Sequence, residues 1–356
     1  MARDHGGDFV GDRDAALAGV HPTTGGAITR LAYARAKAAG VDLEPILKRT
    51  NLTLGQIEDP GARLRVRDQI NFLNLAADEL KDDLLGFHLA LSPDLREIGW
   101  LYYVAASSET MGEALQRGTR YSTIANEGLS LHYLDNTNVV ITVHHVGVSR
   151  HLDRHQIEFV MVALVRMCRQ LSGIRVLPTR VQFMHHRERG CPEVIDFFGS
   201  DVEFGAEIDA ATFAATIAGL PTVSADPYLN RLLVGYCEDA LSRRPPHRGT
   251  FRASVENAIV PLLPHGKVQV GEIARRLGTS QRTFARRLSA EGVTFSEVLE
   301  SLRSDLARRH LADSNISISE IAWLLGYHEV SAFTHAFKRW TGKTPREARS
   351  QIVPAH

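Results

Sequence analysis

Two arginines near the C-terminal end of the chain have the type and the spacing to read duplex DNA. Arg282 and Arg286 are four residues apart, so a helix places them on one face, with Ala285 between them. A guanidinium group can donate two hydrogen bonds, to O6 and N7 of guanine, in the major groove. Phe284 and Leu288 share the same spacing and are predicted to face a core. An arginine stripe is commonly just a solvated surface, so the surrounding elements must decide its role.

The elements that would position these arginines occur twice in the sequence. Residues 272–278 read EIARRLG and residues 320–326 read EIAWLLG, and a helical pattern with inward aromatic residues follows each stretch. An internal repeat of this kind is a fold signal in itself. Gly278 and Gly326 stand where the chain must turn, because glycine adopts positive φ without strain. Each copy therefore predicts a helix–turn–helix unit whose second helix enters the major groove.

Short polar residues mark where the helices of this region begin. Ser280 and Ser317 are placed to cap the helices that follow them. Thr294 and Glu297 have the spacing of a capping box. They open a long helix, predicted over residues 294–313, that would hold the two units at a fixed separation.

The stretch IAWLLGYHEVSAFTHAFKRWTGKTPREAR, residues 321–349, resembles the DNA-binding domain of the AraC/XylS family of bacterial transcription regulators. The first unit and the helix between the units fit the same pattern. The resemblance implies contacts to bases or phosphates from both units. In the first unit these are Ser280, Gln281, Arg282 and Arg286, joined by Arg287 of the arginine stripe; in the second they are Glu329, Val330, Ser331, Thr334, His335 and Lys338.

His335 is a departure from the family pattern, because many members carry arginine at this position. Its side chain is shorter than that of arginine and mostly neutral near pH 7. We therefore expect the first unit to supply more of the affinity for DNA.

The positive charge of the chain is concentrated in the same region. From residue 250 onward there are 15 Lys and Arg against 10 Asp and Glu, although the whole chain is balanced at 41 of each. The preceding part is therefore acidic. A basic C-terminal module behind an acidic N-terminal one fits binding to DNA phosphates.

A length of 356 residues favours two domains over one core. The sequence RRPPHRG at residues 243–249 breaks all periodicity and is typical of a linker. The predicted domain limits are a flexible tail over 1–20, an effector-sensing or dimerisation domain over 21–243, a linker over 244–250 and a DNA-binding domain over 251–350.

The N-terminal domain is predicted to mix strands and helices. Residues 129–133 and 139–143 flank a turn and indicate a hairpin. Residues 155–171 are apolar nearly all round and predict a buried helix, and residues 176–184 and 202–204 predict further strands. This order indicates α+β packing. The predicted fold class is thus an α+β regulatory domain followed by an all-α DNA-binding domain with two helix–turn–helix units.

Residues 96–128, with their cluster of aromatic residues, resemble the regulatory domain of one branch of the same family. This branch includes the ornithine-utilisation and mycobacterial virulence regulators, and its resemblance implies control by a small-molecule effector. Aromatic side chains from this region and from the buried helix could line the effector pocket, or could be ordinary core residues. The candidates are Trp100, Tyr102, Tyr103, Tyr121 and Phe159.

Other reactive side chains do not form a recognisable site in the sequence. The histidine doublets at residues 144–145 and 185–186 cannot easily hold one ion, because neighbouring residues of a strand point to opposite faces. The cysteines Cys168, Cys191 and Cys237 are far apart and lack metal-site spacing. We predict no metal, no cofactor and no catalytic residue.

The sequence therefore predicts a cytoplasmic transcription regulator and not an enzyme. The expected partners are duplex DNA, a small-molecule effector, RNA polymerase and a second copy of the chain. No membrane contact is expected, because no apolar run is long enough to span a bilayer. Two alternatives remain: an architectural DNA-binding protein that only dimerises, without an effector, and a thiol-dependent enzyme domain, with Cys191 as its nucleophile, fused to a DNA-binding tail.

Overall fold

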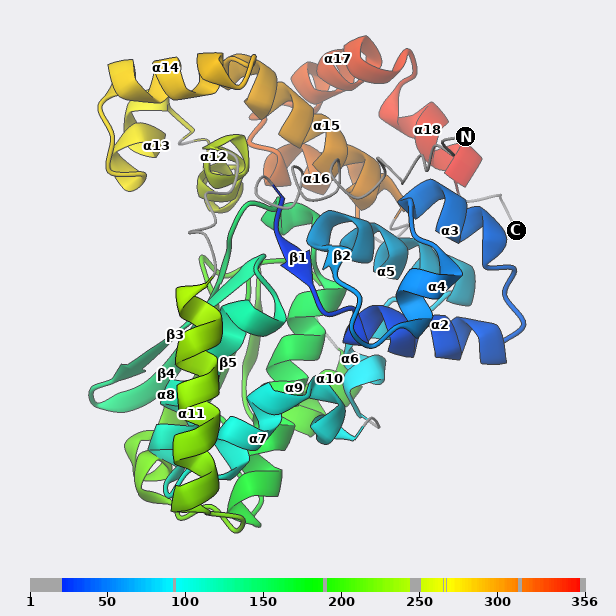
Figure 1. The fold of residues 1–356 in the computed structure, drawn as a ribbon. Coiled ribbons are helices and arrows are strands. Elements are labelled where there is room, and N and C mark those ends of the chain that lie inside the picture. Colours follow the sequence, from blue (N-terminus) through cyan, green and yellow to red (C-terminus); the bar gives the residue numbers. More distant parts are fainter. Residues whose placement is uncertain are drawn as a thin grey trace, which may run out of the picture. The chain divides into compact units, whose positions relative to one another are not determined.

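The computed structural model describes residues 21–91, 94–187, 191–243, 251–264, 266, 268–312 and 316–352. The chain divides into two compact units (Figure 1), with the division between Gly249 and Thr250; Ser149–His151 group with the second unit. The predicted tail over 1–20 and the predicted linker over 244–250 lie outside the described residues. The domain limits therefore stay predictions.

A five-stranded mixed sheet forms the β layer of the first unit. Its strand order is β3 (Leu129–Asp135), β4 (Asn138–His145), β7 (Asp209–Ala214), β5 (Arg180–Phe183) and β6 (Val202–Phe204). Only β5 and β6 pair in parallel. The predicted hairpin is confirmed as β3 and β4, with Tyr133 opposite Ile141. The strand predicted over 176–184 is shorter, because Pro178 cannot donate a hydrogen bond to the ladder.

Helices pack against this sheet, and a separate two-residue strand pair, β1 (Thr23–Thr24) with β2 (Leu64–Arg65), lies among the first of them. The helices of the first unit are α2 (Ala27–Ala38), α3 (Glu44–Thr50), α4 (Leu54–Glu58), α5 (Val66–Leu80), α6 (Leu85–Leu91), α7 (Trp100–Ala106), α8 (Met111–Ala125), α9 (His155–Ser172), α10 (Pro192–Phe198) and α11 (Pro227–Ser242). Elements of both types enclose one large apolar core.

The α9 helix is the central element of that core. It packs against α5, α6, α8 and β7, and Figure 1 shows it passing between the first helices and the sheet. Phe159, Met161, Val162 and Val165 are all buried along it. The buried helix predicted over 155–171 is confirmed, and it places Phe159 in the interior of the unit.

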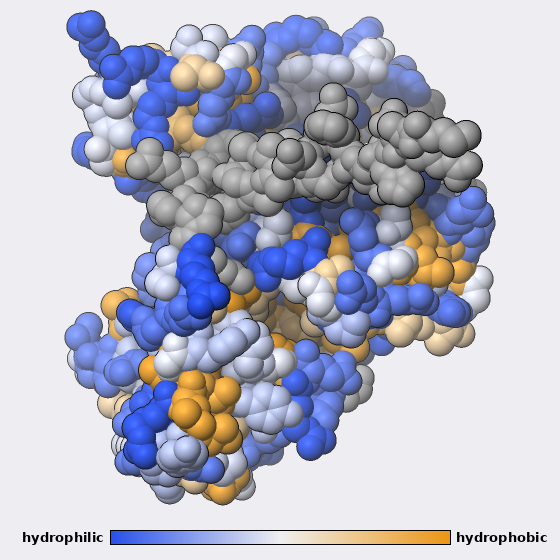
Figure 2. All heavy atoms as spheres, viewed as in Figure 1, coloured by the Kyte–Doolittle hydropathy of each residue, from blue (hydrophilic) through white to orange (hydrophobic). Residues whose placement is uncertain are grey.

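The last helix of the first unit, α11, is only partly covered. Cys237 on its inner face packs with Val104 of α7 and Tyr121 of α8 in a small apolar cluster. Its outer face keeps Leu232 and Tyr236 more than half exposed. Figure 2 shows an apolar patch over this helix. Such a patch on an isolated chain calls for an explanation.

The second unit consists of helices only, among the residues described. They are α12 (Phe251–Ile259), α13 (Val270–Arg276), α14 (Gln281–Ala290), α15 (Phe295–Ala312), α16 (Ile318–Leu324), α17 (Val330–Thr341) and α18 (Pro345–Ile352), with a 3-10 turn over Val260–Leu262. Two separate apolar clusters fill them, and Leu306 of α15 packs against both. The predicted pair of helix–turn–helix units joined by one long helix is confirmed. Among the described helices, none has the length and apolar character needed to cross a bilayer.

Candidate nucleic-acid interface and ligand cavity

In the first helix–turn–helix unit, α14 separates an inner apolar face from an outer polar one. Phe284 and Leu288 are buried, whereas Arg282 and Arg286 are exposed. The Ser280 hydroxyl caps the helix by accepting a hydrogen bond from the Thr283 N–H at 3.2 Å. This cap fixes where α14 starts and so which side chains face outward. The predicted stripe of Arg282 and Arg286 lies on the solvent face.

These two arginines differ from the other basic residues beside them. Within the described ranges, no ion pair or hydrogen bond joins the side chain of Arg282 or of Arg286 to another residue. By contrast, Arg276 of α13 forms an ion pair with Glu272 at 3.1 Å. Arg287, predicted with the DNA contacts, lies with its guanidinium 3.9 Å from the ring centre of Phe251. The structure thus turns Arg287 back onto the domain by a cation–π contact.

In the second helix–turn–helix, α17 presents most of the predicted contact residues to solvent. Those that are exposed are Glu329, Val330, Ser331, His335 and Lys338. Thr334 is half-buried, and its hydroxyl donates to the Val330 carbonyl oxygen at 2.8 Å. Its hydroxyl proton is therefore used within the helix.

The α15 helix joins the second helix–turn–helix to the first. Nε of Arg303 donates to the carbonyl oxygen of Leu325 at 3.0 Å, and its guanidinium lies 4.8 Å from the ring centre of Tyr327. Arg339 of α17 pairs with Glu300 at 2.5 Å. Figure 1 shows α14 at one end of α15 and α17 beside its other half. One rigid helix therefore holds both exposed helices in a single frame.

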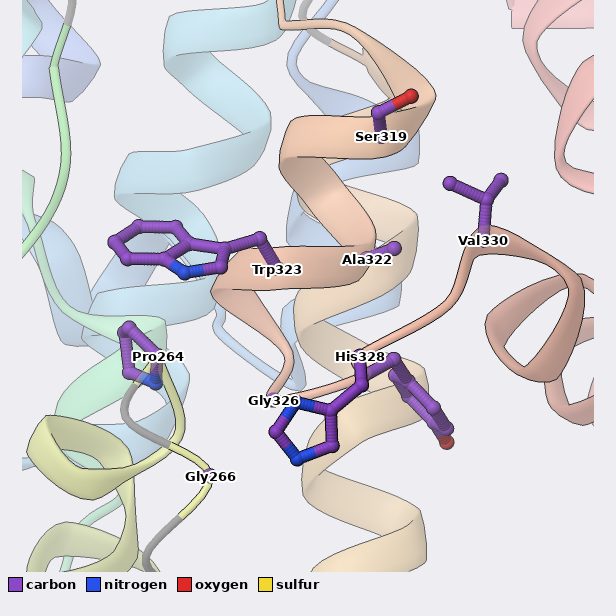
Figure 3. A pocket seen from close by; sticks show the side chains of 9 residues that line it. Pro264, Gly266, Ser319, Ala322, Trp323, Gly326, His328 and Val330 are labelled. Carbon is purple, nitrogen blue, oxygen red and sulfur yellow. The ribbon is translucent and has the colours of Figure 1, made fainter.

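A pocket of about 430 Å³ lies beside the second helix–turn–helix. Figure 3 shows the Trp323 indole and Pro264 on one side of it, and Val330 on the other, with His328 near Gly326. Trp323 is 54% exposed, which is unusual for a residue of its size. The sequence pattern missed this position, because Trp323 falls between the inner and outer faces of a short helix.

A larger cavity of about 700 Å³ lies within the first unit. Four of the five predicted effector residues line it, namely Trp100, Tyr102, Tyr121 and Phe159. The fifth, Tyr103, is 43% exposed and lies outside the lining. Because α7 is helical, Tyr102 and Tyr103 point in directions about 100° apart. A cavity of this size is typical of small-molecule sites.

The lining also contains residues that no sequence pattern singled out. Arg30 and Leu31 come from α2, Gly118 from α8 and Met167 from α9. They are up to 137 positions apart in the sequence, and only the packing of α2, α8 and α9 brings them together. No motif with local spacing could reveal them.

Two histidines of the doublets, His145 and His185, have acidic partners, and two of the cysteines, Cys168 and Cys237, are buried. Nε2 of His145 lies 3.0 Å from Asp153, and Nε2 of His185 lies 2.7 Å from Glu158. No group of three or more potential ligands that could hold a metal occurs in the part of the chain that the structure describes. Burial raises the pKa of Cys168 to about 12 and the pKa of Cys237 to about 11. Both thiols therefore stay protonated near pH 7 and are weak nucleophiles.

Comparison with known protein families agrees with both units. Residues 40–222 match the model of the arabinose-binding domain at the N-terminal end of AraC transcription regulators. Residues 273–351 match the model of a helix-turn-helix domain. The first match alone spans more than half of the chain.

Individual relatives are also transcription regulators. The HTH-type transcriptional regulator VirS of Mycobacterium tuberculosis is 29% identical over 316 residues, which cover 87% of this chain and 92% of VirS. The ornithine utilization regulator of Pseudomonas aeruginosa is 25% identical over 312 residues, which cover 87% of this chain and 91% of that regulator. The solved structure of the transcriptional regulator CdpR from Pseudomonas aeruginosa is 21% identical, with a TM-score of 0.39 over 86% of this chain and 96% of CdpR. The chain belongs to the AraC family of transcription regulators.

Proposed function

We propose that this regulator binds specific DNA sequences through α14 and α17. The observation that carries the proposal is the pair of exposed helices attached to one helix, α15, with Arg282 and Arg286 left without partners among the described residues. On the DNA, the two helices would occupy successive major grooves on one face, about 34 Å apart. Since α15 is a rigid connection, the DNA would have to bend, so its deformability would add to specificity.

The proposed contacts differ in what they recognise. Arg282, Arg286 and Gln281 would read base edges, while Ser280 would hold a phosphate at the start of α14. In the second helix–turn–helix, Lys338 would contact phosphate and add affinity for any DNA sequence. The remaining candidates there, Glu329, Val330, Ser331, Thr334 and His335, would contact base edges or the backbone. Arg287 would support α14 through Phe251.

We further propose that a small molecule bound in the 700 Å³ cavity controls DNA binding. The volume of the cavity and the convergence of four predicted aromatic residues on it support this role. The matched domain model is described as arabinose-binding, and one relative is a regulator of ornithine utilization. Both descriptions fit a sensory N-terminal domain. The regulator would act in the cytoplasm, where bacterial DNA lies, and would exert its effect through RNA polymerase.

A homodimer is the third part of the proposal, with α11 as its contact surface. Tyr228, Leu232 and Tyr236 form an exposed stripe at i, i+4 and i+8, and Gly235 beside them leaves open space for a close approach. A two-fold axis at Gly235 would place Arg231 of one copy opposite Asp239 of the other, because both are four residues from the axis. This charge complementarity favours a second copy as the occupant.

The dimer can be tested by charge reversal. Arg231→Asp alone should convert the dimer to a monomer in light scattering, and the double variant Arg231→Asp/Asp239→Arg should restore it. Val223→Glu is the matched control, because Val223 is an exposed apolar residue outside α11. A monomeric wild-type protein, or a dimer that survives Arg231→Asp unchanged, would exclude this surface.

DNA recognition is tested by selecting genomic DNA fragments with the purified full-length protein at physiological salt. We expect a few enriched sites, each with two half-elements about one helical turn apart. Equal recovery of all fragments, with or without a small-molecule extract of the cells, would instead show that the chain is an architectural DNA-binding protein.

A further inference from the structure

The walls of the 700 Å³ cavity are built mainly from apolar side chains. Leu115 of α8, Leu131 of β3, and Val160, Leu164 and Met167 of α9 belong to the lining, together with the aromatic residues already described. An apolar surface of this extent gains most from an apolar ligand, because burial removes both surfaces from water.

Most polar side chains of the lining already have partners inside the protein. The Tyr121 hydroxyl donates to Glu238 at 2.7 Å, and the Tyr102 hydroxyl accepts from Gln170 at 2.8 Å. Ser122 donates to the Thr119 carbonyl oxygen at 2.8 Å. A ligand rich in hydroxyl groups, such as a sugar, would exchange its hydrogen bonds to water for few new ones. Desolvation of those groups opposes its binding.

Arg30 and Glu97 are the exceptions among these polar groups, because neither side chain is joined to another side chain by a hydrogen bond or ion pair among the described residues. Among the described residues, the only hydrogen bond of the Arg30 side chain joins Nη1 to the Asp59 carbonyl oxygen at 3.5 Å, the limit of such a bond. No carboxylate of the described residues lies within ion-pair distance of Arg30, although the charges of Asp59 and of Glu97, which also lines the cavity, raise its pKa from farther away. Partial burial lowers the pKa of Arg30, so a bound anion would relieve an existing cost. A guanidinium group suits a carboxylate because it donates two parallel hydrogen bonds.

Gly118 shows that the cavity reaches the backbone of α8. A Cβ atom added at this position would meet only Cε of Met167, at 3.9 Å. A larger side chain here would therefore extend into the cavity without a clash at its base. The position offers a way to fill the cavity from a residue that is itself in an ordinary helical conformation.

We infer that this cavity binds an elongated apolar molecule with one carboxylate end, of the chemical class of medium-chain fatty acids. The chain of the ligand lies along the α9 side chains, and its carboxylate meets Arg30 at the α2 end. The inference rests on the proposed role of the cavity as the effector site and names the class of effector.

The probes are hexanoate, octanoate, decanoate, 1-decanol and L-arabinose, titrated calorimetrically into the full-length protein. We expect decanoate to bind and L-arabinose to give no heat. Across the series of acids, Kd should tighten about fourfold for each added methylene, the equivalent of about 0.8 kcal/mol. 1-Decanol should bind more weakly than decanoate, because it lacks the charge that Arg30 recognises.

Three variants locate the ligand. Gly118→Leu fills the cavity and should abolish decanoate binding, while its melting temperature shows that it remains folded. Arg30→Gln should remove the preference for decanoate over 1-decanol and leave 1-decanol binding unchanged. Arg35→Gln is the matched control, since Arg35 lies on the same helix but pairs with Asp82 at 2.7 Å. It should bind both probes as the wild type does.

The inference is overturned if decanoate does not bind, if it binds equally to Gly118→Leu, or if L-arabinose competes for the cavity. A DNA titration with and without the probe separates this outcome from the proposed control of DNA binding. Decanoate that occupies the cavity without changing DNA affinity would leave the ligand class intact and refute effector control. A change in DNA affinity caused by L-arabinose alone would support effector control and refute the ligand class.

Discussion

At the scale of single residues, the basic side chains of the first helix–turn–helix fall into two groups. Arg276 pairs with Glu272, and Arg287 lies over Phe251, so both stabilise the domain itself. Arg282 and Arg286 have no such role among the described residues and remain exposed on α14. Their availability, and not their charge alone, makes them the best candidates for base readout.

Replacing Arg286 by alanine should weaken specific binding by about 1–3 kcal/mol and relax the preference at one base position, because a bidentate contact to guanine is lost. Titrations of the selected site and of its single-base variants at fixed salt measure both effects. Lys338→Ala is the comparison: it should weaken all sequences alike and flatten the salt dependence. Unchanged binding to the selected site by Arg286→Ala would show that α14 is not the reading helix.

His155 makes the first unit sensitive to acid. Burial lowers the pKa of His155 to about 3, and its Nδ1 accepts a hydrogen bond from the Gly86 N–H at 3.3 Å. In the unfolded chain the imidazole takes up a proton below about pH 6.5, whereas in the folded chain it stays neutral. Its contribution to stability is therefore complete above about pH 6.5 and is lost as the pH falls toward the folded pKa.

Between pH 7 and pH 5 this residue should reduce the free energy of unfolding by about 2 kcal/mol. Urea unfolding of wild type and of His155→Gln at pH 7 and pH 5, followed by fluorescence, measures the difference. The variant should lose about 2 kcal/mol less than the wild type over this range. Parallel losses in the two proteins would assign the acid sensitivity to other groups.

Several residue roles followed from local chemistry, and others did not. The caps by Ser280 and by Thr294 with Glu297 were predicted and are present, because capping depends on neighbours three residues away. The cation–π contact of Arg287 could not be predicted, since Phe251 is 36 positions away in the sequence. The exposure of Tyr103 also depends on tertiary packing.

At the scale of elements, the two turns of the helix–turn–helix units have the same backbone conformation but different surroundings. Gly278 and Gly326 both have positive φ, at 62° and 77°. A Cβ atom at Gly278 would meet nothing within 4 Å, whereas one at Gly326 would overlap the carbonyl oxygen of Leu263. The turn at Gly326 is therefore in close contact with Leu263, which precedes the first helix–turn–helix.

Gly278→Ala should cost about 1–2 kcal/mol, the strain of a left-handed conformation. Gly326→Ala should cost about 2–5 kcal/mol, because overpacking adds to that strain. Thermal unfolding of the two variants measures the difference between them. Equal losses of stability in the two variants would mean that the backbone near Leu263 moves to accommodate the added Cβ atom without a measurable loss of stability.

Elements with a strong periodic pattern were predictable, and short ones were not. α9 and the β3–β4 hairpin follow from patterns that depend only on local sequence. α7 was not predicted, because its seven residues, WLYYVAA, contain mostly aromatic and apolar side chains without a visible period. β7, with the sequence DAATFA, was missed because alanine is uncommon in strands.

At the scale of the whole molecule, the presence of two units with different roles could be predicted from the sequence, whereas the cavity could not. The duplicated motif and the uneven charge identify the DNA-binding part locally. The cavity wall combines residues from α2, α7, α8, β3 and α9, which meet only after folding. The chemical class of the proposed ligand is therefore inferred from the structure, whereas the general role of the chain follows from the sequence.

The central claim is that one chain reads DNA with two helices on one face of the duplex. The most direct measurement is a titration of the full-length protein with its selected site and with the same site carrying about five extra base pairs between the half-elements. We predict more than about tenfold weaker binding to the extended site, because half a turn moves one half-element to the opposite face and removes its base contacts. Equal affinity for both sites would contradict simultaneous reading by α14 and α17.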